Sequence, residues 1–136
     1  MSLEIGVCIV LPTGNTIEEV LAISRRNDPT QWGLPGGKLD PFETNMEALL
    51  REVEEECDLE LEDRYCQPIY SGVCYGKDGR DFWVTTYLYE AGWAGEKAME
   101  KGFELKRVEM LWLCNELNSP FAAYNRNVIS AWRAYK

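Results

Sequence analysis

Apolar residues between positions 46 and 57 recur at the spacing of a helix. They stand at i, i+3, i+4, i+7 and i+11 and form one narrow face: Met46, Leu49, Leu50, Val53 and Cys57. Thr44, followed three residues later by Glu47, is a capping box, so this pattern predicts a helix that begins beside Thr44.

Shorter apolar runs, bounded by turn residues, predict β-strands over residues 4–11, 20–26, 68–75, 82–89 and 105–113. A turn at 77–79 would join the third and fourth strands as a hairpin. Ser119 and Pro120 predict the cap and first turn of a second helix, which runs to about residue 134. Residues 1–136 are therefore expected to form one α/β domain with a mixed sheet and two main helices.

Three carboxylates of the first predicted helix share one patch, because Glu52, Glu55 and Glu56 stand at i, i+3 and i+4. Like charges at this spacing repel, and a divalent cation such as Mg²⁺ would reverse that cost. A Gly- and Pro-rich loop at 32–40 leads into the helix, and its free carbonyls suit hard cations. The alternative interpretation is a solvated acidic face, which is the usual role of a charge run.

The segment 37–59 resembles the Nudix box, Gly-x5-Glu-x7-Arg-Glu-U-x-Glu-Glu-x-Gly-U, in which U is a bulky aliphatic residue. Eight of the nine fixed positions match: Gly37, Glu43, Arg51, Glu52, Val53, Glu55, Glu56 and Leu59. Asp58 stands where the family has a glycine that ends the helix in a left-handed conformation. Aspartate adopts that conformation more readily than most residues, at some cost.

The resemblance implies an α/β/α sandwich that hydrolyses a nucleoside diphosphate linked to another group, by attack of water at phosphorus. It implies that Mg²⁺, or Mn²⁺ in its place, is held by four residues: the carbonyl of Gly37 and the carboxylates of Glu52, Glu55 and Glu56. By the same resemblance Arg51 and Glu43 hold those carboxylates in place. The general base is Glu52 or a downstream loop acid, Glu96 or Glu100.

Nucleoside triphosphates or modified purine nucleotides are the expected substrates. Family members of that kind read a purine near the start of the last helix, where Asn125 stands, and Arg25 or Arg26 could meet a phosphate or base. Tyr75 resembles a tyrosine of members that cleave dinucleoside polyphosphates, which is the alternative. Three tryptophans could stack a base, although buried aromatics are usually core: Trp32, Trp83 and Trp112.

Composition narrows the partners and the chemistry. The net charge of −9 argues against nucleic-acid polymers and anionic membranes as partners, but not against a nucleotide bound through a metal. The chain has no histidine, which excludes histidine bases, and its five cysteines without a CxxC motif favour a reducing cytoplasm. The Nudix resemblance also allows a homodimer. A weakly active nucleotide-binding module, suggested by Asp58 alone, is the second class of function that remains open.

Overall fold

The computed structural model describes residues 3–14, 18–25, 28–76, 80–92 and 104–135. The elements follow one another as β1 (Glu4–Val10), β2 (Glu19–Arg25), β3 (Asp28–Gly33), β4 (Gly36–Lys38), α1 (Asn45–Cys57), a 3-10 turn η1 (Asp63–Tyr65), β5 (Cys66–Tyr75), β6 (Asp81–Tyr89), β7 (Leu105–Glu109), α3 (Met110–Leu113) and α4 (Ala122–Ala134). No helix in the described ranges is long and apolar enough to cross a membrane.

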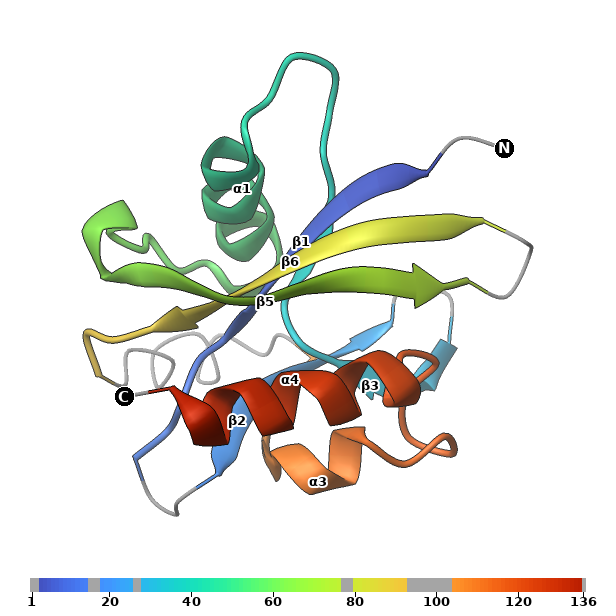
Figure 1. The fold of residues 1–136 in the computed structure, drawn as a ribbon. Coiled ribbons are helices and arrows are strands. Elements are labelled where there is room, and N and C mark those ends of the chain that lie inside the picture. Colours follow the sequence, from blue (N-terminus) through green and yellow to red (C-terminus); the bar gives the residue numbers. More distant parts are fainter. Residues whose placement is uncertain (1–2, 15–17, 26–27, 77–79, 93–103, 136) are drawn as a thin grey trace.

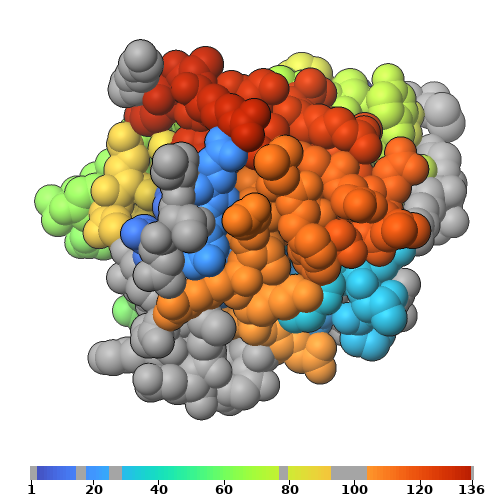
Figure 2. Space-filling model, turned by 90° about the horizontal axis from the view of Figure 1, so that it is seen from below, coloured from blue at the N-terminus to red at the C-terminus, as the bar shows by residue number. Residues whose placement is uncertain are grey.

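Two sheets form the framework of the domain. The larger has the strand order β4-β1-β6-β5, with β1 and β6 parallel and the other neighbours antiparallel. The smaller sheet, β3-β2-β7, is antiparallel. Helix α1 covers one face of the larger sheet, while α4 and the smaller sheet lie on the other side (Figure 1). The expected α/β/α sandwich with a mixed sheet is confirmed, and α3 adds a short third helix beside α4 (Figure 2).

The alternation of β1 divides the core into two clusters. Ile9 points towards α1 and is buried with Leu49 and Val53, whereas Val10 belongs to the cluster under α4, with Val128. Successive side chains of a strand point to opposite faces, so one apolar strand supplies both layers. Truncating a fully buried residue such as Leu49 to alanine is expected to cost about 2–5 kcal/mol.

Both ends of α1 agree with the sequence. Thr44 Oγ1 accepts a hydrogen bond from the Glu47 N–H at 3.1 Å, and Glu47 Oε1 accepts one from the Thr44 N–H at 2.9 Å, which completes the capping box. Asp58 ends the helix at φ 54° and ψ 38°, and its N–H donates to the Glu54 carbonyl. The left-handed conformation expected of Asp58 is therefore confirmed.

Three sequence predictions of local structure were wrong. The segment 32–40, expected to be a loop, contains the end of β3 and all of β4, which pairs with β1. The strand expected over 105–113 ends at Glu109, where α3 begins. The last helix begins at Ala122 instead of Pro120, because Ser119 Oγ accepts the Phe121 N–H in a preceding turn. The hairpin of β5 and β6 is confirmed, although its turn at 77–79 lies outside the described residues.

Candidate active site

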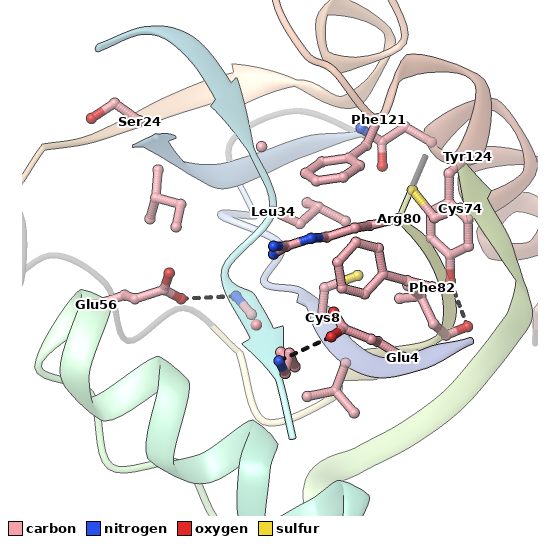
Figure 3. A pocket seen from close by; sticks show the side chains of 18 residues that line it. Glu4, Cys8, Ser24, Leu34, Glu56, Cys74, Arg80, Phe82, Phe121 and Tyr124 are labelled. Atoms are coloured by element: carbon pink, nitrogen blue, oxygen red, sulfur yellow. Dashed lines mark hydrogen bonds and ion pairs between the residues drawn. The ribbon is translucent and has the colours of Figure 1, made fainter. Parts of the chain in front are cut away.

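A pocket of about 410 Å³ opens between the two sheets, beside the carboxylate end of α1. Its wall includes Glu56 from α1, Gly36 and Gly37 from β4, and apolar residues from β1 and β6. One end of the pocket thus reaches Glu56, which belongs to the acidic patch predicted from the sequence. The other end has an aromatic wall that includes Phe82 and Phe121 (Figure 3).

Arg51 holds together one acidic residue that precedes α1 and two that lie within it. Its Nε and Nη2 donate to the two carboxylate oxygens of Glu43, at 2.7 and 2.9 Å, and its Nη1 donates to Glu52 Oε1 at 2.7 Å. The same Nη1 lies 3.4 Å from Glu55 Oε2, and Nη2 donates to the Lys38 carbonyl at 3.2 Å. The structure therefore brings Arg51, Glu43, Glu52 and Glu55 together.

These contacts set the charge states of the cluster. The Arg51 guanidinium, helped by the backbone N–H of Asp40, lowers the pKa of Glu43 from 4.5 to about 2. In return, the hydrogen bonds from Glu43 and then Glu52 raise the pKa of Arg51 above its ordinary value. Both groups stay charged throughout the physiological range, so Arg51 is a permanent anchor for the carboxylates beside it.

Two carboxylates of α1 lie directly against the backbone of β4. Glu56 Oε1 accepts a hydrogen bond from the Gly36 N–H at 2.8 Å (Figure 3). A Cβ atom on Gly37 would lie 2.5 Å from the Glu52 carboxyl carbon, so this approach requires glycine. A Cβ atom on Gly36 would collide with the Val7 carbonyl oxygen, which also requires glycine. The two glycines let the helix carboxylates touch the strand.

The residues at this place fit a hard divalent cation in their chemistry. Glu52, Glu55 and Glu56 offer carboxylate oxygens on successive turns, and the Gly37 backbone lies against one of them. As the side chains stand, no group of three acidic, cysteine or histidine residues within the described ranges is gathered closely enough to hold a metal ion. Arg51 Nη1 contacts both Glu52 and Glu55, whereas Glu56 accepts a hydrogen bond from the Gly36 N–H of β4 instead.

Asn125 lines the pocket, but part of its hydrogen-bonding capacity is already used. Only 3% of the residue is exposed, and its Nδ2 donates to the Leu113 carbonyl at 3.2 Å and to Ser119 Oγ at 3.4 Å. Both amide protons are engaged, so only the carbonyl oxygen is left for a ligand. A bidentate contact with a purine, which needs an amide donor as well, does not fit this arrangement.

Of the other predicted substrate contacts, Tyr75 is the one whose side chain the structure describes. Tyr75 is 74% exposed and is not part of the wall of this pocket, so its predicted contact with a dinucleoside polyphosphate stays a prediction. Arg25 ends β2, and nothing is described of its side chain. Arg26, Glu96 and Glu100 lie outside the described residues, so their predicted roles stay predictions.

None of the three tryptophans forms the pocket wall. The Lys106 Nζ lies 4.1 Å from the ring centroid of Trp32 and 4.0 Å from that of Trp112, so these two rings clamp a lysine. Trp83 is 43% exposed and lies elsewhere on β6. The aromatic residues of the pocket are instead Phe82, Phe121 and Tyr124, which the sequence analysis missed. Phe82 alternates with Val84 on one face of β6, and that alternation was the available signal.

A buried chain of hydrogen bonds runs beneath the pocket. Cys8 Sγ lies 3.1 Å from Thr86 Oγ1, which lies 2.7 Å from the Tyr124 hydroxyl, and that hydroxyl donates to the Val84 carbonyl at 3.0 Å. Burial raises the pKa of the Cys8 thiol to about 12 and also raises the pKa of Tyr124. Neither group ionises near neutral pH, so both serve as wall residues and not as nucleophiles.

The comparisons with known proteins agree with this geometry. The model of the NUDIX domain matches residues 3–132, so the chain belongs to the Nudix family and is a pyrophosphohydrolase by family. Among curated proteins there is no match.

Similar solved structures have low sequence identity. The E. coli ORF135 protein shares 18% identity at a TM-score of 0.68, covering 98% of this chain and 93% of that one. The Ap4A hydrolase of C. elegans shares 17% sequence identity at a TM-score of 0.67, and the match covers 98% of each chain. A MutT NUDIX hydrolase from Burkholderia pseudomallei shares 24% sequence identity at a TM-score of 0.62. The match covers 81% of this chain and 85% of that one. At these identities the structures support the fold and leave the substrate open.

Proposed function

We propose that this chain is a metal-dependent hydrolase that cleaves a phosphoric anhydride of nucleoside triphosphates or modified purine nucleotides. The observation that carries the proposal is the position of the pocket, whose wall includes Glu56 and the Gly36–Gly37 backbone. A nucleotide with its base between the sheets would bring its phosphates to the second half of α1, which carries Glu52, Glu55 and Glu56 (the carboxylate end of α1). Metal-assisted hydrolysis of a polyphosphate needs that juxtaposition.

The proposed metal ligands are the Gly37 carbonyl and the carboxylates of Glu52, Glu55 and Glu56. Bound Mg²⁺ or Mn²⁺ would neutralise phosphate charge and lower the pKa of a coordinated water. Arg51 orients Glu52 through the 2.7 Å hydrogen bond to Oε1, and Glu43 orients Arg51 through its two hydrogen bonds.

Glu52 is the proposed general base. Its Oε1 accepts the hydrogen bond from Arg51, so Oε2 is the oxygen that would take the proton from the attacking water. In this role Arg51 fixes the direction of the carboxylate. Glu96 and Glu100 stay the alternative bases, as the sequence suggested.

The proposed base site has an aromatic wall and one fixed acceptor. Phe82 and Phe121 would place aromatic rings beside a bound base, and the Asn125 carbonyl oxygen would accept one N–H of a purine edge. Because the Asn125 amide protons are engaged, the preferred base is one that presents an N–H donor at that position. Arg25, at the end of β2, is kept as a proposed contact to the substrate.

A dinucleoside polyphosphate is the alternative substrate. Tyr75 is the last residue of β5, and its exposed ring could stack on a second nucleoside that extends beyond the pocket. The fold similarity to an Ap4A hydrolase is consistent with this alternative without deciding it. A weakly active binding module is the other alternative, because Asp58 replaces the glycine of the box.

Location and assembly form part of the proposal. All five cysteines are free thiols, which supports a reducing compartment such as the cytoplasm. We propose small nucleotides as the partners, with nucleic-acid polymers disfavoured by the net charge of −9, and a homodimer as an assembly to test by sedimentation.

A panel of nucleotides tests this proposal. Nucleoside triphosphates, oxidised purine triphosphates and dinucleoside tetraphosphates would be incubated with the protein and Mg²⁺, and the released phosphate products measured. The proposal expects the highest kcat/KM for a purine triphosphate or its modified form. The highest kcat/KM for a dinucleoside tetraphosphate, lost in Tyr75→Ala, would replace the proposal with the alternative. Tight binding without turnover of any nucleotide would favour the binding module.

A further inference from the structure

Arg80 is a pocket residue that the sequence analysis did not single out. It directly precedes β6 and forms part of the pocket wall together with Phe82, Phe121 and Glu56. Figure 3 shows its side chain extending across the pocket, with the rings of Phe82 and Phe121 on either side in this view. The guanidinium lies towards β4, the strand that Glu56 contacts.

Arg80 also differs from Lys38 and Arg51 in its ion pairs. Lys38, at the pocket rim, pairs with Glu4 at 3.1 Å, and Arg51 is held by Glu43 and Glu52. No carboxylate in the described part of the chain forms an ion pair with Arg80. The chain as a whole is acidic, with 23 acidic and 14 basic residues. A pocket cation that has no carboxylate partner among the described residues would therefore attract an anionic ligand locally.

We propose that Arg80 binds a phosphate group of the nucleotide and thereby determines which ligands the pocket accepts. This inference rests on the proposed function. The planar guanidinium presents paired N–H donors that match two oxygens of a phosphate, which a lysine ammonium cannot do. A phosphate chain between Arg80 and the carboxylate end of α1 would be held at both ends, so the pocket selects nucleoside polyphosphates over nucleosides.

Two variants test this assignment. Arg80→Ala should raise the KM for a nucleoside triphosphate about 10- to 100-fold, as expected for a lost hydrogen bond to a charged group, while kcat changes by only a few-fold. Arg80→Lys keeps the charge but loses the paired geometry, so its KM should lie between those of wild type and Arg80→Ala. Both variants should unfold at the wild-type temperature, because Arg80 is exposed.

Binding measurements separate a phosphate contact from a base contact. The dissociation constants of a nucleoside and of its monophosphate would be measured by calorimetry for wild type and Arg80→Ala. Loss of Arg80 should weaken binding of the monophosphate and leave that of the nucleoside unchanged. An equal loss for both ligands would show that Arg80 contacts the base, and the inference would be wrong.

Arg64→Ala is the matched control. It removes the same charge from an exposed arginine on η1 that pairs with Glu62 and is not part of the pocket wall, so its KM should equal that of wild type. An equal rise of KM in both variants would mean that overall charge, not a contact, is responsible, and would overturn the inference. If the wild-type protein hydrolyses no nucleotide, the proposed function is wrong. If the wild-type protein is active and Arg80→Ala has the same KM, only the proposed role of Arg80 is wrong.

Discussion

Arg51 and Glu43 form a paired hydrogen bond, with Nε at 2.7 Å from one carboxylate oxygen and Nη2 at 2.9 Å from the other. Glu43 precedes α1 and Arg51 lies in its middle, so the pair ties the connection after β4 to the helix. The remaining nitrogen, Nη1, is thereby aimed at Glu52, the carboxylate proposed to take a proton from water.

The first prediction concerns the loss of this pair. Glu43→Gln keeps the shape of the side chain but offers only one acceptor atom, so Arg51 loses one anchor and holds Glu52 less firmly. We expect kcat or the affinity for Mg²⁺ to fall about 10- to 100-fold, as for other residues that orient metal ligands. The matched control is Glu54→Gln, an exposed residue of the same helix whose side chain has no role in the proposed site. Equal losses in the two variants would contradict the assignment.

The second prediction follows from the pKa of Glu43, which Arg51 lowers from 4.5 to about 2. A carboxyl group whose pKa is lower in the folded than in the unfolded state stabilises the fold. Its contribution is fully present when the pH is above the pKa of the unfolded state. This contribution decreases as the pH falls below about 4.5 and is gone below about 2. The difference in melting temperature between wild type and Glu43→Gln should therefore be constant above pH 5 and shrink as the pH approaches 2. A difference that stays the same across this range would show that the pair contributes nothing through charge.

The third prediction concerns the end of α1. Asp58 has a positive φ of 54°, a conformation that costs non-glycine residues energy. Asp58→Gly should raise the free energy of unfolding by roughly 0.5–1 kcal/mol, measured by urea denaturation. Asp58→Ala, which keeps the strain, should give no gain. A less stable Asp58→Gly would mean that the aspartate side chain contributes more through its contacts than the strain costs.

The fourth prediction uses the close contact between Gly37 and Glu52. A methyl group on Gly37 would lie 2.5–2.8 Å from the Glu52 carboxylate atoms, so Gly37→Ala must displace that carboxylate. We expect a fall in kcat of about 100-fold, similar to other losses of a stabilising group at an active site. Gly6→Ala on β1 is the control, because its added methyl would meet only ordinary contacts at 3.4 and 3.6 Å. A Gly37→Ala variant as active as Gly6→Ala would refute the proposed role of Glu52.

The predictability of each feature depended on whether its signal was local in sequence. The capping box at Thr44 and the apolar face of α1 involve neighbours within a few turns, and both are confirmed. β4 escaped notice because two of its three residues are glycines, which leave no alternation of apolar and polar side chains to read.

The composition of the pocket needed the tertiary structure. Arg80, Phe82 and Phe121 come together only because β6 pairs with β1 and α4 packs against the same sheet. The orientation of Asn125 was equally hidden, since its partners are a carbonyl in α3 and a hydroxyl in the turn before α4. The acidic residues of α1 could be predicted as a group, whereas their division between Arg51 and β4 could not.

The rate of nucleotide hydrolysis by Glu56→Gln, compared with that of the wild-type protein, tests the proposed metal site most directly. The glutamine keeps an oxygen that can accept the 2.8 Å hydrogen bond from the Gly36 N–H, so the fold should be preserved while one negative charge is removed. Wild type should hydrolyse its best nucleotide with Mg²⁺, lose activity with EDTA and regain it with Mg²⁺ or Mn²⁺. Under the same conditions Glu56→Gln should turn over on the order of 100-fold more slowly or worse. Equal rates for Glu56→Gln and wild type would contradict the proposed metal site.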